Sequence, residues 1–144
     1  PAPIFGFDII AGPRKVTGAF HDFSPTNKDH WMLEWFHDNN KDFKPKKERE
    51  LPEWARNIFS GNMIAAGNVN SEEELNKILE LVKRNLNFYL SNIGEVTPDD
   101  YTKEQNFYCQ NQKKNPHTPR VMTSLGLDPE EVNTFIQEGL FPEI

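Results

Sequence analysis

The first ten residues constrain the fold most strongly, because they contain a short apolar run that is typical of a β-strand. Residues 3–10 are rich in β-branched and aromatic side chains, and the run closes at Gly12-Pro13. Side chains alternate between the two faces of a strand, which places Phe5 and Phe7 on one face. Because apolar side chains occupy both faces, we expect a strand in the interior of a sheet that is covered on both sides.

Asp8 is the one charged residue in this strand, and it shares its face with Ile4 and Ile10. A carboxylate among apolar neighbours must be paired, face a cavity or hold a proton. That is the physical profile of a functional acid. The alternative is a carboxylate near a strand end that reaches water or a backbone N–H. The residues alone leave both interpretations open.

Composition excludes several classes of function. The 144 residues suit a single domain over 1–144, and eleven phenylalanines supply core material. A net charge of −6 argues against a nucleic-acid-binding protein, which needs a basic surface. Apolar runs are too short to cross a membrane. Cys109 is the single cysteine, so we expect no disulfide within the chain, no cysteine-based metal site, and a reducing, cytoplasmic location.

Strands come first in this chain and helices later, which predicts an α+β fold. Residues 15–23 suit a second strand in an antiparallel hairpin with the first, and residues 57–66 suit one or two strands around Gly61. Expected helices span residues 30–36, 101–114 and 120–125. A loop is expected at 94–99, with a helix start at Thr97-Pro98-Asp99. The last helix is expected to begin at Asp128 and to end at Gly139. A longer amphipathic helix begins at Asn70 or Ser71, and its apolar face is Leu75, Ile78, Leu79, Val82 and Leu86.

The three histidines at positions 21, 30 and 37 match no metal-binding spacing, so we interpret them as packing or polar residues and expect no metal site.

A basic cluster interrupts this acidic chain. Lysines stand at positions 41, 44, 46 and 47, and Arg49 follows them. The cluster is either a solvated loop or a docking patch for an acidic partner, whose encounter it would accelerate.

Several separated motifs resemble one family, the ferredoxin-dependent bilin reductases. They are the strand motif over residues 4–12, Asp-Phe-Ser-Pro at 22–25, Arg-Glu-Leu-Pro-x-Trp at 49–54, Ile-Phe-Ser at 58–60, Tyr-Cys-Gln at 108–110, Asn-x-x-Thr-x-Arg-Val at 115–121 and Gly-Leu-Phe at 139–141. Their order and spacing agree along the whole chain. The blocks at 49–54 and 108–110 look most like the phycocyanobilin-forming members.

This resemblance implies a three-layer α/β/α sandwich whose central antiparallel sheet is flanked by helices. It implies an oxidoreductase that reduces biliverdin IXα to a phytobilin, of which phycocyanobilin is favoured. It also implies that the protein holds no cofactor of its own, that reduced ferredoxin delivers single electrons, and that side chains donate protons. We expect a monomer that binds neither nucleic acid nor membrane.

The resemblance also assigns roles to residues. Asp8 falls on the catalytic aspartate, which favours a proton donor with a raised or shared pKa. Arg49 and Thr17 match positions near a propionate of the substrate, and the four lysines would dock ferredoxin. Further substrate-binding positions are Asn115, His117, Val121, Trp54, Leu140 and Phe141.

Three departures keep alternatives open. Pro116 and His117 stand where the phycocyanobilin enzymes have an aspartate and a propionate-binding lysine. The family's glutamate and histidine partners of the catalytic aspartate lie upstream of Pro1, so we expect a longer complete protein and no activity from residues 1–144 alone. The alternatives are a phycoerythrobilin-forming, phage-type reductase, a non-catalytic bilin-binding module and a plain interaction domain.

Overall fold

A computed structural model describes residues 2–95 and 101–144. Their contacts divide the chain into unit 1, residues 1–51 and 59–99, and unit 2, residues 52–58 and 100–144. Unit 1 carries the sheet, and unit 2 is helical. The helix start expected at Thr97 lies outside the described residues. One domain over 1–144 stays a prediction.

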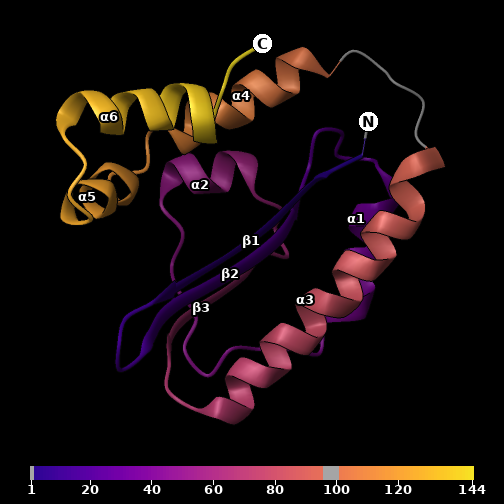
Figure 1. Ribbon diagram of the computed structural model, residues 1–144. Coiled ribbons are helices and arrows are strands. Elements are labelled where there is room, and N and C mark those ends of the chain that lie inside the picture. Colours follow the sequence, from indigo (N-terminus) through magenta and orange to yellow (C-terminus); the bar gives the residue numbers. More distant parts are fainter. Residues whose placement is uncertain (1, 96–100) are drawn as a thin grey trace. The chain divides into compact units, whose positions relative to one another are not determined.

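The sheet of unit 1 is antiparallel. Strands β1 (Ile4–Ala11), β2 (Val16–Ser24) and β3 (Ile64–Val69) follow one another in the order β1-β2-β3 (Figure 1). The pairing of β1 with β2 runs from Ile4 opposite Ser24 to Ala11 opposite Val16, and a bulge follows Ile10. The expected hairpin and the α+β class are therefore confirmed.

The expectation that β1 is covered on both sides is wrong. Among the described strands β1 lies at the edge, paired with β2 alone. Phe7 and Ile10 are 39% and 40% exposed, and Asp8 is also exposed. Apolar side chains on both faces report what a strand could bury, whereas the number of neighbouring strands decides what it does bury. The central position belongs to β2, where Ala19 and Phe23 are fully buried.

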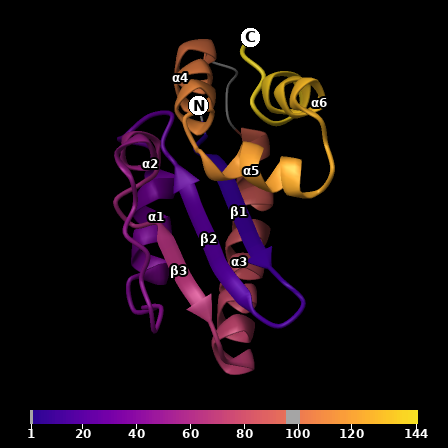
Figure 2. The ribbon, with the colours of Figure 1, turned by 90° about the vertical axis from the view of Figure 1, so that its left-hand side faces the viewer.

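Two helices cover one face of this sheet. Helix α1 spans Trp31–Asn40, and helix α3 spans Glu72–Asn92 and continues into a 3-10 turn, Ile93–Glu95. Figure 2 shows both helices behind the strands, with α1 towards β3 and α3 towards β1. The core between them contains Ala19, Ala66 and Ile78 in one cluster, and Phe23 and Phe36 in another. A second helical layer, and with it the three-layer sandwich, stays a prediction.

Helix α3 begins as the sequence predicts, but its apolar face is only partly buried. Ser71 caps it by accepting a hydrogen bond from the backbone N–H of Glu74 at 3.2 Å. Ile78 and Val82 are buried, whereas Leu79 and Leu86 are 40% and 36% exposed. The predicted burial of these two leucines is therefore wrong, because the sheet covers a narrower arc of the helix than the apolar residues span.

The prediction of strands throughout residues 57–66 is also wrong. Residues Glu53–Ile58 form helix α2 in unit 2, and the strand begins only at Ile64. The carbonyl of Pro52 accepts from the N–H groups of Ala55 and Arg56, which starts a helical turn. Ala55 and Ile58, three residues apart, are the buried side chains of that helix.

The helices of unit 2 largely confirm the sequence analysis. They are α4 (Thr102–Gln112), α5 (His117–Ser124), α6 (Pro129–Thr134) and a π-helical segment, η2 (Phe135–Leu140). Gly126, two residues after the end of α5, has a φ of 99°, a backbone conformation that favours glycine. A capping box between Asp128 and Glu131 begins α6. No helix in residues 2–95 or 101–144 has both the length and the apolar character needed to cross a bilayer.

A buried polar network joins the sheet to the helices. His21 of β2 lies 2.7 Å from the carbonyl of Gly6 through Nδ1, which must therefore be the protonated nitrogen. Nε2 then accepts from Asn85 of α3 at 3.0 Å, and Asn85 also donates to Asn40 of α1 at 3.1 Å. Burial lowers the pKa of His21 from 6.5 to about 4, against the opposing effect of the Gly6 hydrogen bond. The core therefore holds a neutral histidine.

This pKa predicts how acid destabilises unit 1. The unfolded chain binds a proton at His21 near pH 6.5, whereas the folded chain does so only near pH 4. Stability contributed by the neutral ring is therefore fully present above 6.5 and lost as the pH falls towards 4, by on the order of 3 kcal/mol. Urea unfolding at several pH values should show this slope in the parent and lose it in His21→Leu. Equal slopes in both would contradict the assignment.

Candidate functional site

Asp8 stands on the sheet face opposite α1 and α3. Its register partner is Phe20 of β2, and strand alternation places both on the face that His21 does not share. Within the described part of the chain, the Asp8 carboxylate has neither a hydrogen bond nor an ion pair. The side chain reaches solvent, but neighbouring protein atoms desolvate it enough to raise its pKa above the ordinary 3.8. Asp8 is thus an available acid.

Arg49 lies on the same face, brought there by a short extended segment. Its N–H donates to the carbonyl of Ala65 at 2.9 Å, and Glu48 forms a bridge with Ala66, so this segment runs beside β3. The guanidinium carbon lies 5.8 Å from the ring centre of Phe20. Nη2 donates to the carbonyl of Thr17 at 3.1 Å. The structure therefore brings together three predicted site residues, Asp8, Thr17 and Arg49, within unit 1.

Two glycines make room for these side chains. A Cβ on Gly18 would lie 2.7 Å from Cε2 of Phe20, and a Cβ on Gly67 would lie 2.9 Å from Cγ of Arg49. Both side chains therefore lie flat against the sheet. No salt bridge among the described residues involves Arg49, so its fork is available to a carboxylate. The hydroxyl of Thr17, in contrast, donates to the carbonyl of Ile10 at 3.1 Å.

Asp22 is a buried acid that the sequence analysis did not single out. It is 1% exposed and accepts hydrogen bonds from the Ser24 hydroxyl at 3.0 Å, the Ser60 N–H at 2.8 Å and the Ser60 hydroxyl. Burial raises its pKa, and these hydrogen bonds act in the opposite direction. The motifs at 22–25 and 58–60 are therefore joined by one carboxylate. The pattern Asp22-x-Ser24 in the strand is the sequence signal that could have identified this acid.

A cavity of about 360 Å³ lies beside Arg49 in unit 1, between the end of α1 and the start of β3. Lys41 and Lys44 line it, together with His37 and Glu48. All four lysines of the basic cluster are exposed. Lys41 pairs with Asp38 at 3.3 Å, and Lys46 donates to the Ser71 hydroxyl at 3.2 Å. Lys44 and Lys47 belong to none of the salt bridges found among residues 2–95 and 101–144.

The remaining predicted site residues belong to unit 2. Asn115 uses its side-chain oxygen to accept from the N–H of His117 at 3.0 Å, at the start of α5. His117 is exposed, as are Val121 at 44% and Leu140 at 39%. Trp54 of α2 and Phe141, which follows η2, are half-buried.

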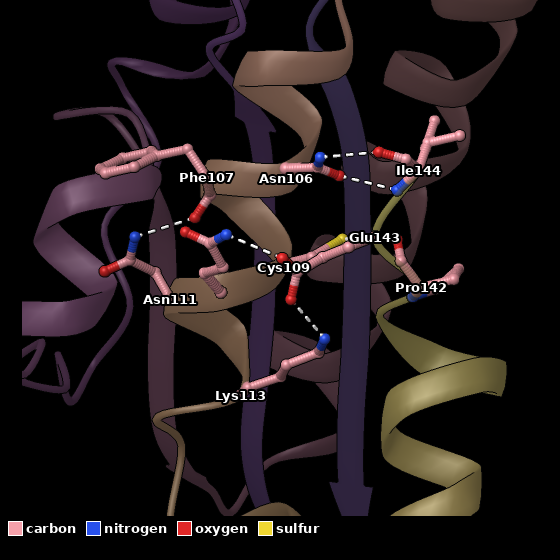
Figure 3. A network of polar contacts seen from close by, with 9 residues as sticks. Asn106, Phe107, Cys109, Asn111, Lys113, Pro142, Glu143 and Ile144 are labelled. Carbon is pink, nitrogen blue, oxygen red and sulfur yellow. Dashed lines mark hydrogen bonds and ion pairs between the residues drawn. The ribbon is translucent and has the colours of Figure 1, made fainter.

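Helix α4 holds the segment that follows Leu140 and Phe141. Figure 3 shows side chains along one face of α4 directed at residues 142–144. Asn106 exchanges two hydrogen bonds with the backbone of Ile144, at 2.9 and 3.0 Å. Lys113 and Gln110 each bind the Glu143 carboxylate at 2.7 Å, which lowers the pKa of Glu143. These contacts fix the chain immediately after two predicted site residues.

The histidines have separate roles. His30 accepts from the N–H of Met32 at the start of α1, and His37 lies 2.9 Å from Asn62 through Nδ1. Across the described ranges, no three His, Cys, Asp or Glu side chains gather as a metal site would require.

Comparison with known proteins identifies the relatives of this chain. Residues 1–142 match the family model described as ferredoxin-dependent bilin reductase. A phycocyanobilin:ferredoxin oxidoreductase of Synechococcus sp. (strain CC9605) is 32% identical over 132 residues, 83% of this chain and 52% of the relative. One from Prochlorococcus marinus (strain MIT 9313) is 32% identical over 152 residues, 98% of this chain and 56% of the relative. The chain thus spans little more than half the length of these relatives.

The close contact at Gly67 predicts how the Arg49 position depends on it. In Gly67→Ala, the new Cβ displaces the Arg49 side chain from the sheet, at a cost of roughly 1–3 kcal/mol for overpacking. The Arg49 Hε resonance should lose its ring-current shift from Phe20. Gly61→Ala is the control, because a Cβ there meets no atom within 4 Å. Identical spectra and stabilities for both variants would refute the contact.

Proposed function

Because the chain belongs to the ferredoxin-dependent bilin reductase family, we propose that the complete protein reduces biliverdin IXα with electrons from reduced ferredoxin. The product we propose is phycocyanobilin, since the relatives carry that name. The observation that carries the proposal is that one face of the sheet holds both an available acid, Asp8, and a guanidinium without a salt bridge in the described residues, Arg49. That pairing suits a substrate that needs protons and bears carboxylates.

Asp8 acts as the general acid in this proposal. Reducing one double bond of a tetrapyrrole adds two electrons and two protons; ferredoxin supplies the electrons one at a time. Each added electron makes the bilin a stronger base, so a nearby acid can then protonate it. A desolvated carboxyl with a raised pKa keeps its proton at a higher pH than an ordinary aspartate does.

Arg49 binds a propionate of the substrate. The guanidinium can offer two parallel N–H groups to a carboxylate, and Thr17 fixes it through its carbonyl. We propose that six residues of unit 2 also bind this substrate, and the support for them is the family resemblance. They are Asn115, His117, Val121, Trp54, Leu140 and Phe141.

Turnover of the complete protein with biliverdin and reduced ferredoxin under anaerobic conditions tests the proposal. Asp8→Asn keeps the shape but cannot donate the proton, so we expect a loss of about 10²–10⁴-fold in rate and accumulation of a bilin radical. Asp29→Asn, an exposed aspartate in the loop before α1, is the matched control and should turn over normally.

Separation of the products by chromatography completes this test. Phycocyanobilin supports the proposal, and phycoerythrobilin would assign the other reductase type. Bound but unreduced biliverdin would favour a non-catalytic binding module, whereas full activity of Asp8→Asn would remove Asp8 from the role of donor.

The basic cluster docks ferredoxin in this proposal. Lys44 and Lys47 are exposed lysines without a salt bridge in the described residues, so they can meet an acidic partner. In Lys44→Gln/Lys47→Gln, kcat/KM for ferredoxin should fall several-fold at low salt, and the difference should shrink as salt screens the charges. Lys28→Gln, outside the cluster, should behave as the parent does. Loss of activity that does not respond to salt would contradict docking by charge.

A further inference from the structure

The contacts that α4 makes with the segment after η2 bear on the site as well as on the fold. We propose that Lys113 and Gln110, which bind Glu143, are positioning residues of the proposed site. They hold Leu140 and Phe141 where these two side chains meet the substrate. The inference rests on the proposed function, because the substrate contacts of Leu140 and Phe141 belong to that proposal. All the residues involved lie in unit 2.

One face of α4 binds residues 142–144 so that this segment runs back along the helix. The side chains that bind it stand at positions 106, 109, 110 and 113, spaced so that they share one face (Figure 3). Asn106 binds the N–H and the carbonyl of Ile144 at 2.9 and 3.0 Å. Cys109 donates to the carbonyl of Pro142 at 3.4 Å. We call these four side chains and their contacts the α4 clamp.

The charged part of the α4 clamp is an ion pair that is partly withdrawn from water. Lys113 donates to one oxygen of the Glu143 carboxylate and Gln110 donates to the other, each at 2.7 Å. The side chain of Lys113 is only 15% exposed, and that of Glu143 is 37% exposed. Removal of one charge leaves its partner poorly hydrated, so this pair matters more than a fully exposed one does. Of the ion pairs found within residues 2–95 and 101–144, it is the one that joins segments far apart in the chain.

The helical turn before the α4 clamp has an unusual register. Segment η2 is π-helical, and the N–H of Phe141 donates to the carbonyl of Ile136, five residues back, at 3.0 Å. Turns of this kind are rare, and they occur frequently at functional sites. With α-helical closure, the N–H of Leu140 would take the place of the Phe141 N–H at this carbonyl. The register therefore decides which of the two residues stands above Ile136, which is buried.

Leu140 and Phe141 lie between two restraints. The hydrogen bond to Ile136 holds them on one side, and the α4 clamp holds them on the other. Leu140 is 39% exposed and Phe141 is half-buried, so packing in the core does not fix them by itself. Loss of the clamp frees this part of the chain to take the α-helical register. Both side chains would then leave the positions that the π-helical turn gives them.

Reversal of each charge in the complete protein tests the proposal. In Lys113→Glu and in Glu143→Lys, we expect KM for biliverdin to rise at least about fivefold while kcat changes less than about twofold, because binding is weakened and the chemistry is not. The double variant Lys113→Glu/Glu143→Lys restores an ion pair, and Gln110 can turn its amide oxygen towards the introduced ammonium group. We expect its KM to lie within about twofold of the parent value.

Hydrogen exchange gives a readout that does not depend on turnover. The amides of Phe141 and Ile144 report on the two restraints, and each should exchange at least about tenfold faster in the single variants and at the parent rate in the double variant. Glu73→Lys and Lys77→Glu are the matched controls, because this pair on α3 is also joined at 2.7 Å but is 73% and 61% exposed. They should leave KM and both exchange rates unchanged.

Circular dichroism checks that each variant is folded, and Lys113→Met, which keeps the apolar stem and loses the charge, is a milder probe of the same kind. An active parent whose single variants keep its KM, or a double variant that does not recover, would overturn the proposal. Faster exchange without a change in KM would also overturn it, because the clamp would then be structural alone. An inactive parent would instead contradict the proposed function, and the positioning role would fall with it.

Discussion

The structure of unit 1 depends on the alternation of side chains along β2 from Ala19 to Phe23. This strand pairs with a neighbour on each edge. Because side chains alternate along it, every odd-numbered side chain from Ala19 to Phe23 enters the helical layer. The even-numbered positions, Phe20 and Asp22, face the other way. One face therefore becomes a core with a neutral buried histidine, and the other keeps polar chemistry. A shift of register by one residue would exchange the two environments.

The polar chemistry divides by burial on that second face. Asp22 is buried and accepts hydrogen bonds from Ser24 and Ser60, so it links β2 to the chain near Ser60. Burial raises the pKa of both carboxyl groups, but Asp8, one strand away at the edge of the described sheet, has no such partners among the described residues. Two aspartates on one face thus differ in their surroundings, which is why we propose only Asp8 as the proton donor. An acid without protein partners is the one that can deliver a proton to a substrate.

Local patterns in the sequence predicted most elements, because strands, caps and breakers are local signals. The hairpin, the Ser71 cap and the capping box at Asp128 depend on a few adjacent residues. The errors concern environment. The coverage of β1 and the burial of Leu79 depend on how many neighbours each element has, which no local pattern records. The apolar stretch at 57–66 suited a strand by composition, but a helical turn started by the carbonyl of Pro52 took its first residues.

The candidate site shows the same difference between what local sequence signals predict and what depends on distant neighbours. Asp8 was conspicuous in the sequence because it interrupts an apolar strand. The place of Arg49 beside Phe20 was not conspicuous, since Arg49 follows Phe20 by about thirty residues and is brought to it by an extended segment that runs beside β3. Gly18 and Gly67 become meaningful only once the side chains above them are known. Resemblance to a family suggested the proposed roles, and the geometry of unit 1 supports those of Asp8 and Arg49.

The central claim is that biliverdin binds the sheet face that carries Asp8 and Arg49. Methyl-labelled NMR of the complete protein during a titration with biliverdin tests it directly, because adjacent residues report on opposite faces. Ala65 is the register partner of Phe20, whereas Ala66 is that of Ala19 in the helical core. We predict large ring-current shifts for the methyl groups of Ala65 and Ile10, and small ones for Ala66 and Ile9. The reverse pattern, or no shift on either face, would contradict the account.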